Sequence, residues 1–273
     1  MLREMQVAGL FYEADKEQLE KNMQSYFGKE QGKEENKKQG EKPLARICIL
    51  PHAGHIYSGR VTAETLAKIV LPQKLIILCP NHTGLGRHGA IWDKGAFQTP
   101  FGEVPIAADI AETLLKNPCF CKDYLAHARE HSIEVILPFL QYILGQPLQI
   151  VPISLAALKF LPEMAEAIIK CMQEHADVGL IVSSDMNHFA SEKENKRKDF
   201  LALDAIKNMD ENKLLQVVMD NDISMCGVLG AYVALITAKA LGLQRCELVS
   251  YDTSASTSGD KNRVVGYAGL YFI

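Results

Sequence analysis

The sequence lacks an excess of charge of either sign, an apolar run at its start, and cysteines paired as in zinc sites or disulfide frameworks. Its 29 Lys and Arg residues against 33 Asp and Glu residues give a net charge of −4, and the basic residues are scattered. Nucleic-acid binding depends on clustered positive charge, so we expect no nucleic-acid partner. Residues 1–11 have neither the apolar core nor the cleavage site of a signal peptide. We therefore expect a cytoplasmic protein whose seven cysteines form no disulfides.

Long apolar segments are also scarce. Cys226–Leu243 approaches the length of a membrane span, which is about 18–20 residues. It contains Lys239 and three glycines, and no second segment resembles it. A helix packed on all sides gives the same pattern. We interpret this segment as a buried helix and expect no membrane association.

The chain is large enough to bury a substantial core, so we expect a single domain over residues 1–273. Residues 28–42 carry five lysines and four glutamates and no apolar residue. Such a segment cannot anchor to a core, and we expect it to be a mobile charged surface loop. A short helix is expected before it, at Asp15–Tyr26, with Asp15 as the N-cap.

After this loop, short runs rich in Ile, Val and Leu alternate with longer stretches of helical period. This alternation predicts an α/β fold of three layers, αβα, with a largely parallel central sheet. The expected strands are Ala45–Leu50, Leu75–Cys79, Leu148–Ile153, Gly179–Ser183, Glu247–Tyr251 and Val264–Phe272. The expected helices are Arg60–Ile69, Ala107–Lys116, Ser132–Leu144, Leu161–Glu174, Lys193–Met209, Asn212–Met219 and Cys226–Ala240.

Three of the expected strands are followed by a histidine: His52, His82 and His188. Ligands of open α/β sheets bind beyond the carboxyl ends of the strands. One such histidine is ordinarily a loop residue bonded to backbone, but three at equivalent positions indicate a shared site. Imidazole is a common metal ligand and also titrates near neutral pH. The pattern therefore predicts either a metal site or acid–base chemistry.

Two further segments point to the same edge of the sheet. Cys226 is expected to open a helix, where exposed N–H groups and the helix dipole stabilise a thiolate; the alternative is a buried, inert cysteine. Glu130-His131-Ser132-Ile133-Glu134 resembles a helix start, in which Ser132 caps while His131 or Glu134 faces the cleft. Capping alone explains that segment equally well. His55 is another possible cleft residue.

Taken together, the motifs resemble those of the Memo family, whose prokaryotic branch is called AmmeMemoRadiSam system protein B. The resemblance spans nearly the whole chain in the family's order, with residues 28–42 outside it. It rests on AGxFY (8–12), PHAGxxYSG (51–59), PNH (80–82), TPxG (99–102), EHSIExxLPFLQ (130–141), SSDxxH (183–188), CG (226–227) and YAG (267–269).

The resemblance implies a fold similar to that of class III extradiol dioxygenases. It implies that metal or active-site ligands fall on His52, His82 and Cys226. Asp185 and His188 match the remaining pair in the cleft, where the dioxygenases keep a catalytic histidine. The family name also implies association with radical-SAM and AMMECR-like proteins in a shared modification pathway.

The implied ligand set departs from that of the dioxygenases, which use two histidines and a carboxylate. Two histidines and a thiolate form a softer site, which favours Cu, Zn or a thiolate-tolerant Fe. Our leading hypothesis is therefore a metal-dependent redox or oxidoreductase-type enzyme acting on a small molecule or peptide. His188 would serve as the acid–base group, and Asp185 would orient it or bind substrate.

Two alternatives remain open. The first is a metal-free hydrolase with Cys226 as nucleophile, His188 as base and Asp185 as the residue orienting that base. The second is a binding module that keeps an enzyme's cleft without its reaction and recognises a peptide or phosphopeptide, as is reported for eukaryotic members of the family.

Overall fold

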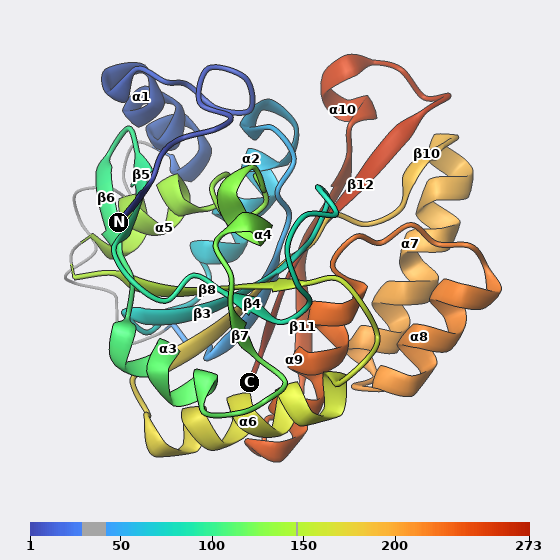
Figure 1. Ribbon diagram of the computed structural model, residues 1–273. Coiled ribbons are helices and arrows are strands. Elements are labelled where there is room, and N and C mark those ends of the chain that lie inside the picture. The colour runs from blue at the N-terminus through green and yellow to red at the C-terminus, as the bar shows by residue number, and fades with distance from the viewer. Residues whose placement is uncertain (29–41, 146) are drawn as a thin grey trace.

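The computed structural model describes residues 1–28, 42–145 and 147–273 (Figure 1). The charged segment expected to be a mobile loop, 28–42, falls almost entirely outside these residues. Helix α1 (Lys16–Phe27) begins after Asp15, whose side chain accepts a hydrogen bond from the Gln18 N–H. The expected N-cap and helix are confirmed.

Within the described residues, nine strands form the larger sheet, in the order β10-β12-β2-β9-β3-β8-β4-β7, with β11 paired to β12. The central strands β2, β9, β3 and β8 are parallel. Every residue of β2 and β9 is buried, as expected for strands covered on both faces. The bounds are β2 Ile47–Leu50, β3 Lys74–Pro80, β4 Ala90–Ile91, β7 Cys121–Lys122, β8 Gln149–Leu155, β9 Val178–Ser183, β10 His188–Ala190, β11 Cys246–Thr253 and β12 Val264–Phe272.

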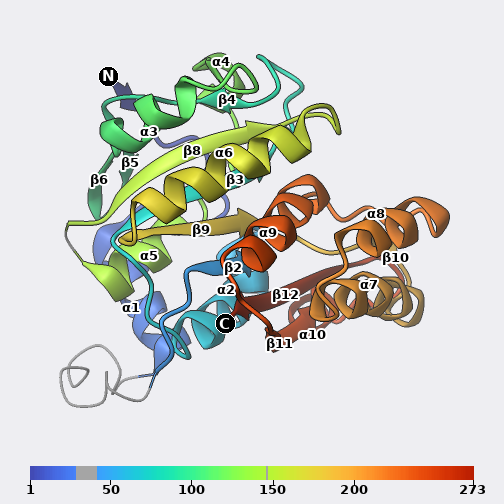
Figure 2. The same cartoon turned by 90° about the horizontal axis from the view of Figure 1, so that it is seen from below.

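Helices cover both faces of this sheet (Figure 2). One layer holds α1, α2 and α5, and the other holds α3, α6, α9, α8 and α7. The expected three-layer αβα fold with a largely parallel sheet is confirmed. The helix bounds are α2 His55–Leu66, α3 Ala108–Leu115, α4 Leu125–Ala128, α5 Leu137–Leu144, α6 Leu161–Glu174, α7 Glu192–Lys207, α8 Glu211–Asp220, α9 Val228–Ala240 and α10 Ala255–Ser258.

Three expected helix starts are wrong. Helix α2 begins at His55, five residues before the expected Arg60, and α9 begins at Val228 rather than Cys226. Helix α5 begins at Leu137 instead of Ser132 because the Ser132 hydroxyl and N–H both bond to the Glu130 side chain and cap no helix.

The apolar segment expected to be a buried helix is α9. It packs against α6, α8 and the strands β3 and β9, and it is only 13 residues long. Among the described helices, none has both the length and the apolar character needed to cross a bilayer.

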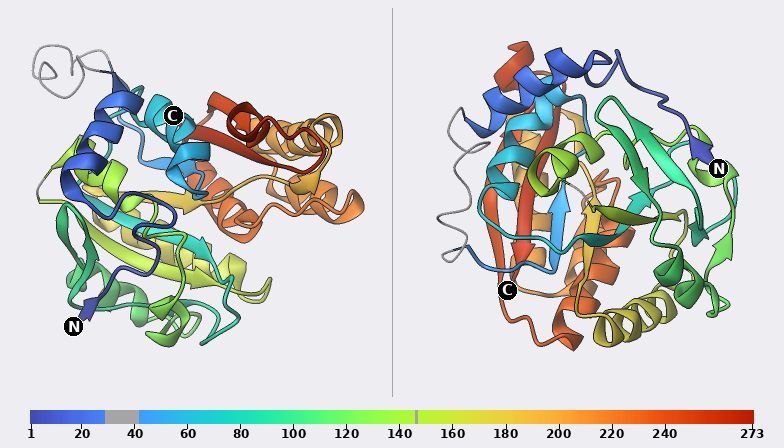
Figure 3. Two further views of the ribbon diagram at one scale, coloured as in Figure 1. Left: turned by 90° about the horizontal axis from the view of Figure 1, so that it is seen from above. Right: turned by 90° about the vertical axis from the view of Figure 1, so that its left-hand side faces the viewer.

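A second sheet has three strands, β1 (Leu2–Arg3), β5 (Ala96–Thr99) and β6 (Gly102–Pro105), and lies where the chain begins (Figure 3). Strand β1 pairs with β5 in parallel, and the Ala96 N–H donates to the Met1 carbonyl. These strands were not expected, because each has only two to four residues. They hold the start of the chain against the body of the fold.

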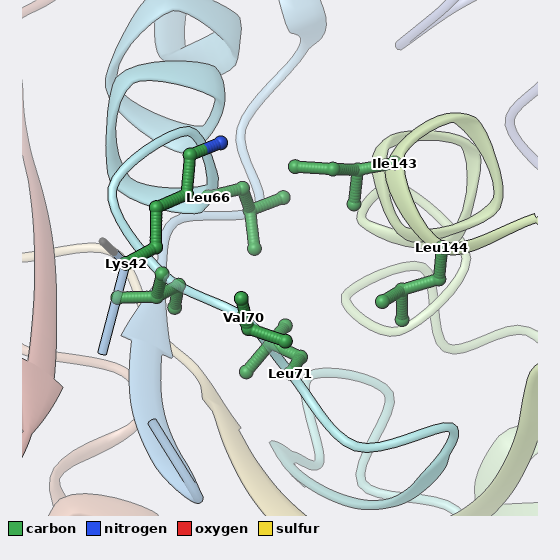
Figure 4. Close-up of a pocket in the computed structure, with 7 residues that line it drawn as sticks. Lys42, Leu66, Val70, Leu71, Ile143 and Leu144 are labelled. Carbon is green, nitrogen blue, oxygen red and sulfur yellow. The ribbon is translucent and has the colours of Figure 1, made fainter. Parts of the chain in front are cut away.

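An apolar hollow of about 50 Å³ lies between the carboxyl-terminal ends of α2 and α5 (Figure 4). Leu66, Val70, Leu71 and Ile143 contribute aliphatic walls. The hollow is well below the roughly 300 Å³ typical of the smallest ligand pockets. It also lies at the opposite end of α2 from the histidines, so it is not the candidate site.

Candidate metal centre

Three adjacent strands, β2, β9 and β3, deliver the candidate residues to one edge of the sheet. His52 follows β2, Asp185 follows β9 and His82 follows β3, while Cys226 comes from the segment before α9. The ligand atoms of His52, His82 and Cys226 all lie within 4.8 Å of one another. Bonds of about 2.0–2.3 Å to a tetrahedral ion place neighbouring ligand atoms roughly 3.3–3.8 Å apart. Small side-chain shifts therefore suffice to surround one ion.

The ring orientation of His52 is determined by Ser183. The Ser183 hydroxyl donates to the carbonyl oxygen of Ser132 at 2.7 Å. With its one hydrogen committed, that hydroxyl accepts a bond from Nδ1 of His52, also at 2.7 Å. The proton of the neutral ring therefore lies on Nδ1, and Nε2 presents its lone pair toward the Cys226 Sγ, 3.4 Å away.

Glu130 fixes His82 in the same way. Its Oε1 lies 2.9 Å from His82 Nδ1, and its Oε2 accepts the His82 backbone N–H at 2.7 Å. A carboxylate only accepts, so Nδ1 donates and Nε2 is left available. Burial alone raises the pKa of Glu130, but the bonds from His82 and Ser132 outweigh it and hold that pKa at about 2. Glu130 is therefore a permanent anion behind His82.

A second group of potential ligands, His82, Glu130 and His131, overlaps the first. Glu130 Oε1 already accepts bonds from His82 Nδ1 and from the Ser132 hydroxyl and N–H. These bonds suit Glu130 to orienting His82 rather than ligating an ion. The His131 ring stacks on that of His82 with centroids 4.9 Å apart, so His131 lies beside the cluster.

The electrostatics keep most of these rings neutral. Burial, together with the neighbouring His82 and His131, lowers the pKa of His52 well below its ordinary value. Burial also lowers the pKa of His131. For His82, burial lowers the pKa, but the Glu130 carboxylate raises it more. Neutral imidazole is the form that binds metal ions.

Cys226 differs from the expectation of a thiolate stabilised by a helix terminus. It precedes the N-cap Gly227 of α9, and burial followed by the charge of Asp185 raises the pKa of its thiol far above the usual value. The sulfur accepts the Asp185 N–H at 3.2 Å. Gly227 is required at this turn, because a Cβ there would lie 2.3 Å from the Cβ of Ser184.

Asp185 and His188 complete the group. Asp185 Oδ1 accepts the His52 N–H at 2.8 Å, and Oδ2 lies 4.0 Å from His52 Nε2. Burial raises the pKa of Asp185. The ring of His188 donates from Nδ1 to the carbonyl oxygen of Ser224 at 2.8 Å. Ser224, rather than Asp185, therefore orients His188, which corrects one of the two roles expected for Asp185.

Two possible cleft residues lie outside the cluster. Glu134 is fully buried; its carboxylate pairs with Arg3 and accepts the Tyr12 hydroxyl at 2.7 Å, which anchors the N-terminal segment. The His55 ring donates from Nε2 to the Val135 carbonyl at 2.8 Å and packs in the interior.

Sequence reasoning missed three residues that orient the histidines: Glu130, Ser183 and Ser224. Each contacts Nδ1, the ring nitrogen that faces away from the potential ion or substrate. Glu130 and Ser183 do so through their side chains, and Ser224 does so through its main-chain carbonyl. These residues are visible in the sequence, but their role is not. A serine at the end of a strand, or a glutamate just before a histidine, is equally compatible with an ordinary loop.

The fold and the site define a class of protein: a three-layer α/β protein with a candidate metal centre of two histidines and a cysteine at the carboxyl edge of its sheet. The chain belongs to the Memo family, because the family model described as "Memo-like protein" matches residues 3–271. This confirms the family resemblance seen in the motifs.

Named relatives agree over full length. The chain is 37% identical to a "MEMO1 family protein" of Aquifex aeolicus, over 100% of this chain and 99% of the relative. It is 39% identical to a protein of the same name from Sulfolobus acidocaldarius, with the same coverage. Among solved structures, the uncharacterized protein JW3007 of Escherichia coli K12 matches with a TM-score of 0.52 and 11% identity, covering 82% of this chain and 98% of that one. At that identity the match supports the fold alone.

Proposed function

We propose that the protein binds one metal ion through His52, His82 and Cys226 and uses it in a redox or oxidoreductase-type reaction. The observation that carries this proposal is the hydrogen bonding behind the two histidines. Both Nδ1 atoms face an oxygen acceptor, so the available lone pair of each neutral ring lies on Nε2. Ligating histidines in metal sites are held in this way by carboxylates, carbonyls or water.

The donor set fits a soft or borderline cation. Two imidazoles and one thiolate suit Cu, Zn or a thiolate-tolerant Fe better than a hard ion such as Mg²⁺. Bound Zn would supply Lewis-acid polarisation to a small-molecule or peptide substrate, and bound Cu or Fe would also supply electron transfer. Three protein ligands also leave a coordination position for substrate or water, as in catalytic rather than structural sites.

The chain's own residues have separate tasks in this proposal. His188 holds or accepts a proton at Nε2, because its Nδ1 hydrogen is committed to Ser224. Asp185 fixes the loop that carries His52 through the backbone N–H groups of His52 and Ala53. Its second carboxylate oxygen is the one placed to contact substrate.

The metal-free hydrolase fits less well. A nucleophilic cysteine needs a lowered pKa or a base in contact with its sulfur. Burial instead raises the pKa of Cys226, and the ring nearest its sulfur belongs to His52 rather than His188. A bound cation that took the place of the thiol proton would instead hold Cys226 as a thiolate ligand.

The test is anaerobic calorimetry with Cu(I), Zn(II) and Fe(II) on the wild type and on His52→Ala and Cys226→Ser. We expect one tight equivalent of at least one of these ions, lost in both variants. Matched controls are His175→Ala and Cys121→Ser, which lie outside the cluster and should bind as the wild type does. Tight binding that survives both cluster variants would refute the ligand assignment, and no binding at all would favour the peptide-binding module.

A further inference from the structure

We infer that Asn187 and Ser224 are positioning residues, which together hold the ring of His188 in one tautomer with Nε2 available to the site. The inference rests on the proposed function only in the role given to His188. Ser224 lies two residues before Cys226 in the chain, but neither Ser224 nor Asn187 makes a hydrogen bond to His52, His82 or Cys226 in the bonds described above.

Ser224 holds His188 at two points. Its hydroxyl oxygen accepts the His188 backbone N–H at 2.8 Å, and its carbonyl oxygen accepts Nδ1–H of the His188 ring, also at 2.8 Å. The first bond places the Cα of His188 and the second sets the rotation of its ring. Because a carbonyl never donates, the second bond also selects the Nδ1–H tautomer.

Asn187 holds Ser224 in turn. The side-chain oxygen of Asn187 accepts the Ser224 N–H at 3.0 Å and lies 3.3 Å from the Ser224 hydroxyl. The Ser224 hydroxyl thus receives a bond from His188 and can give its own hydrogen to Asn187. Both donors of Ser224 are directed at one buried oxygen, which fixes the position of Ser224 beside the His188 ring.

The other end of Asn187 is fixed to helix α7. Its amide nitrogen donates to the Asn195 side-chain oxygen at 2.8 Å, and its backbone N–H donates to Asp199 at 2.7 Å. Asn195 donates to Asp199 in turn, at 2.9 Å. Asn187 is 1% exposed, and Asn195 and Asp199 are fully buried. A buried network in which each member is bonded is rigid and specific in geometry.

The backbone around His188 shows the same constraint. The pairing of β10 with β12 shifts register between His188 and Ala190. Phe189, which lies between them, has a φ of 64° and is 61% exposed. A left-handed conformation is unfavourable for an aromatic residue and tends to occur where surrounding contacts impose it. Irregularities of this kind are common beside functional sites, where they redirect side chains, and this one begins at His188, whose ring contacts Ser224.

The test reads the tautomer directly, by long-range ¹H–¹⁵N spectra of metal-free protein labelled at histidine, with His188→Gln used to assign the signals. In the wild type we expect His188 as a single Nδ1–H tautomer. Ser224→Ala keeps the carbonyl but loses the hydroxyl bonds that hold His188 and Asn187 beside it, and Asn187→Ala loses the oxygen that holds Ser224. In both variants the ring is no longer held against the carbonyl, and we expect His188 to populate both tautomers while His52 and His82 keep theirs. Ser224→Thr retains the hydroxyl and should restore the wild-type signal.

Amide hydrogen exchange gives a second readout in the milder variant. Ser224→Ala removes the acceptor of the His188 N–H, so exchange at His188 should accelerate about two- to tenfold, the effect of one hydrogen bond. Thr113→Val removes an exposed hydroxyl bond on α3 and should change neither readout. If folded Ser224→Ala keeps both the single tautomer and the slow exchange, the positioning role is wrong, whatever Asn187→Ala does.

These outcomes are separable from those of the proposed function. Neither spectrum requires a metal ion or turnover, so the positioning role can be established even if the protein binds no metal. Conversely, metal affinity in Ser224→Ala should stay within about threefold of the wild type, since additive behaviour is expected for groups that share no partner. If Ser224→Ala shows both tautomers of His188 and binds metal as tightly as the wild type, both proposals are supported.

Discussion

Replacing Glu130 by glutamine should weaken metal binding although it leaves the three proposed ligands, His52, His82 and Cys226, unchanged. In the wild type, the carboxylate accepts Nδ1–H of His82 through one oxygen and the His82 backbone N–H through the other. Glutamine offers a single oxygen, and its NH₂ group must face one of these donors. His82 then loses either its ring acceptor or its backbone acceptor, and Nε2 is no longer held in place.

The expected magnitude follows from the hydrogen bond that His82 no longer makes. Loss of a residue that orients a ligating histidine typically lowers metal affinity about 10- to 100-fold, or roughly 1.4–2.7 kcal/mol. An unpaired buried donor also costs about 1–3 kcal/mol of folding free energy. The two effects are measured separately, by calorimetric titration with Zn(II) and by urea unfolding of the metal-free protein.

Glu134→Gln is the matched control. Glu134 is also a buried glutamate, four residues further along, but its carboxylate bonds to Arg3, Tyr12 and backbone rather than to a histidine. We expect Glu134→Gln to lose stability at least as strongly while keeping Zn(II) affinity within about threefold. Equal losses of affinity in the two variants, or an unchanged affinity in Glu130→Gln, would refute the reasoning.

Three further predictions concern stability. Burial raises the pKa of Asp199 from 3.8 to about 6. The folded state then retains a proton that the unfolded state releases, so this contribution is present below about pH 4 and lost as the pH rises through 6, at most about 3 kcal/mol. Urea unfolding across this range should show that slope, and Asp199→Ala should lack it. Arg3→Ala leaves Glu134 as an unpaired buried anion and should cost about 3–5 kcal/mol in urea unfolding. Gly227→Ala forces a Cβ to within 2.3 Å of Ser184, and it should cost about 1–3 kcal/mol in thermal unfolding and displace Cys226 enough to lower metal affinity in calorimetry.

Much of the fold follows from local pattern. Helix α6 has the expected bounds, Leu161–Glu174, because a proline stands in its first turn and one face is apolar at helical spacing. Strands with continuous apolar runs were also located. Strands β1, β4 and β7 were not, because each has two residues and exists only through pairing with distant segments. Local sequence carries no signal for such pairing.

The start of α5 was misplaced for a related reason. Ser132, followed by Ile133 and Glu134, resembles a capping sequence, and a local rule assigns its hydroxyl to the helix. In the folded protein the Ser132 hydroxyl donates to the Glu130 side chain, and Glu134 forms an ion pair with Arg3. The competing partner Arg3 is 131 residues from Glu134, which no window of sequence includes.

The same division runs through the site. Strand ends determine which side chains reach the edge of the sheet, and that much is visible in sequence. Which ring nitrogen faces the cleft depends on partners that are far away in the chain: His82 and Glu130 are 48 residues apart, and His52 and Ser183 are 131 apart. The residue types of the cluster could therefore be predicted, while the arrangement of their protons could not.

The hydrogen-bond partners of the histidine rings are also the best support for the proposed function. His52, His82 and His188 each have an acceptor at Nδ1, and the three acceptors are chemically different: a hydroxyl, a carboxylate and a carbonyl. A role in fold stability alone would be served by hydrogen bonds at either ring nitrogen. Three unrelated acceptors that leave the same nitrogen available are more simply explained by a requirement at Nε2. In the function proposed above, ligation would meet that requirement at His52 and His82, and proton transfer would meet it at His188.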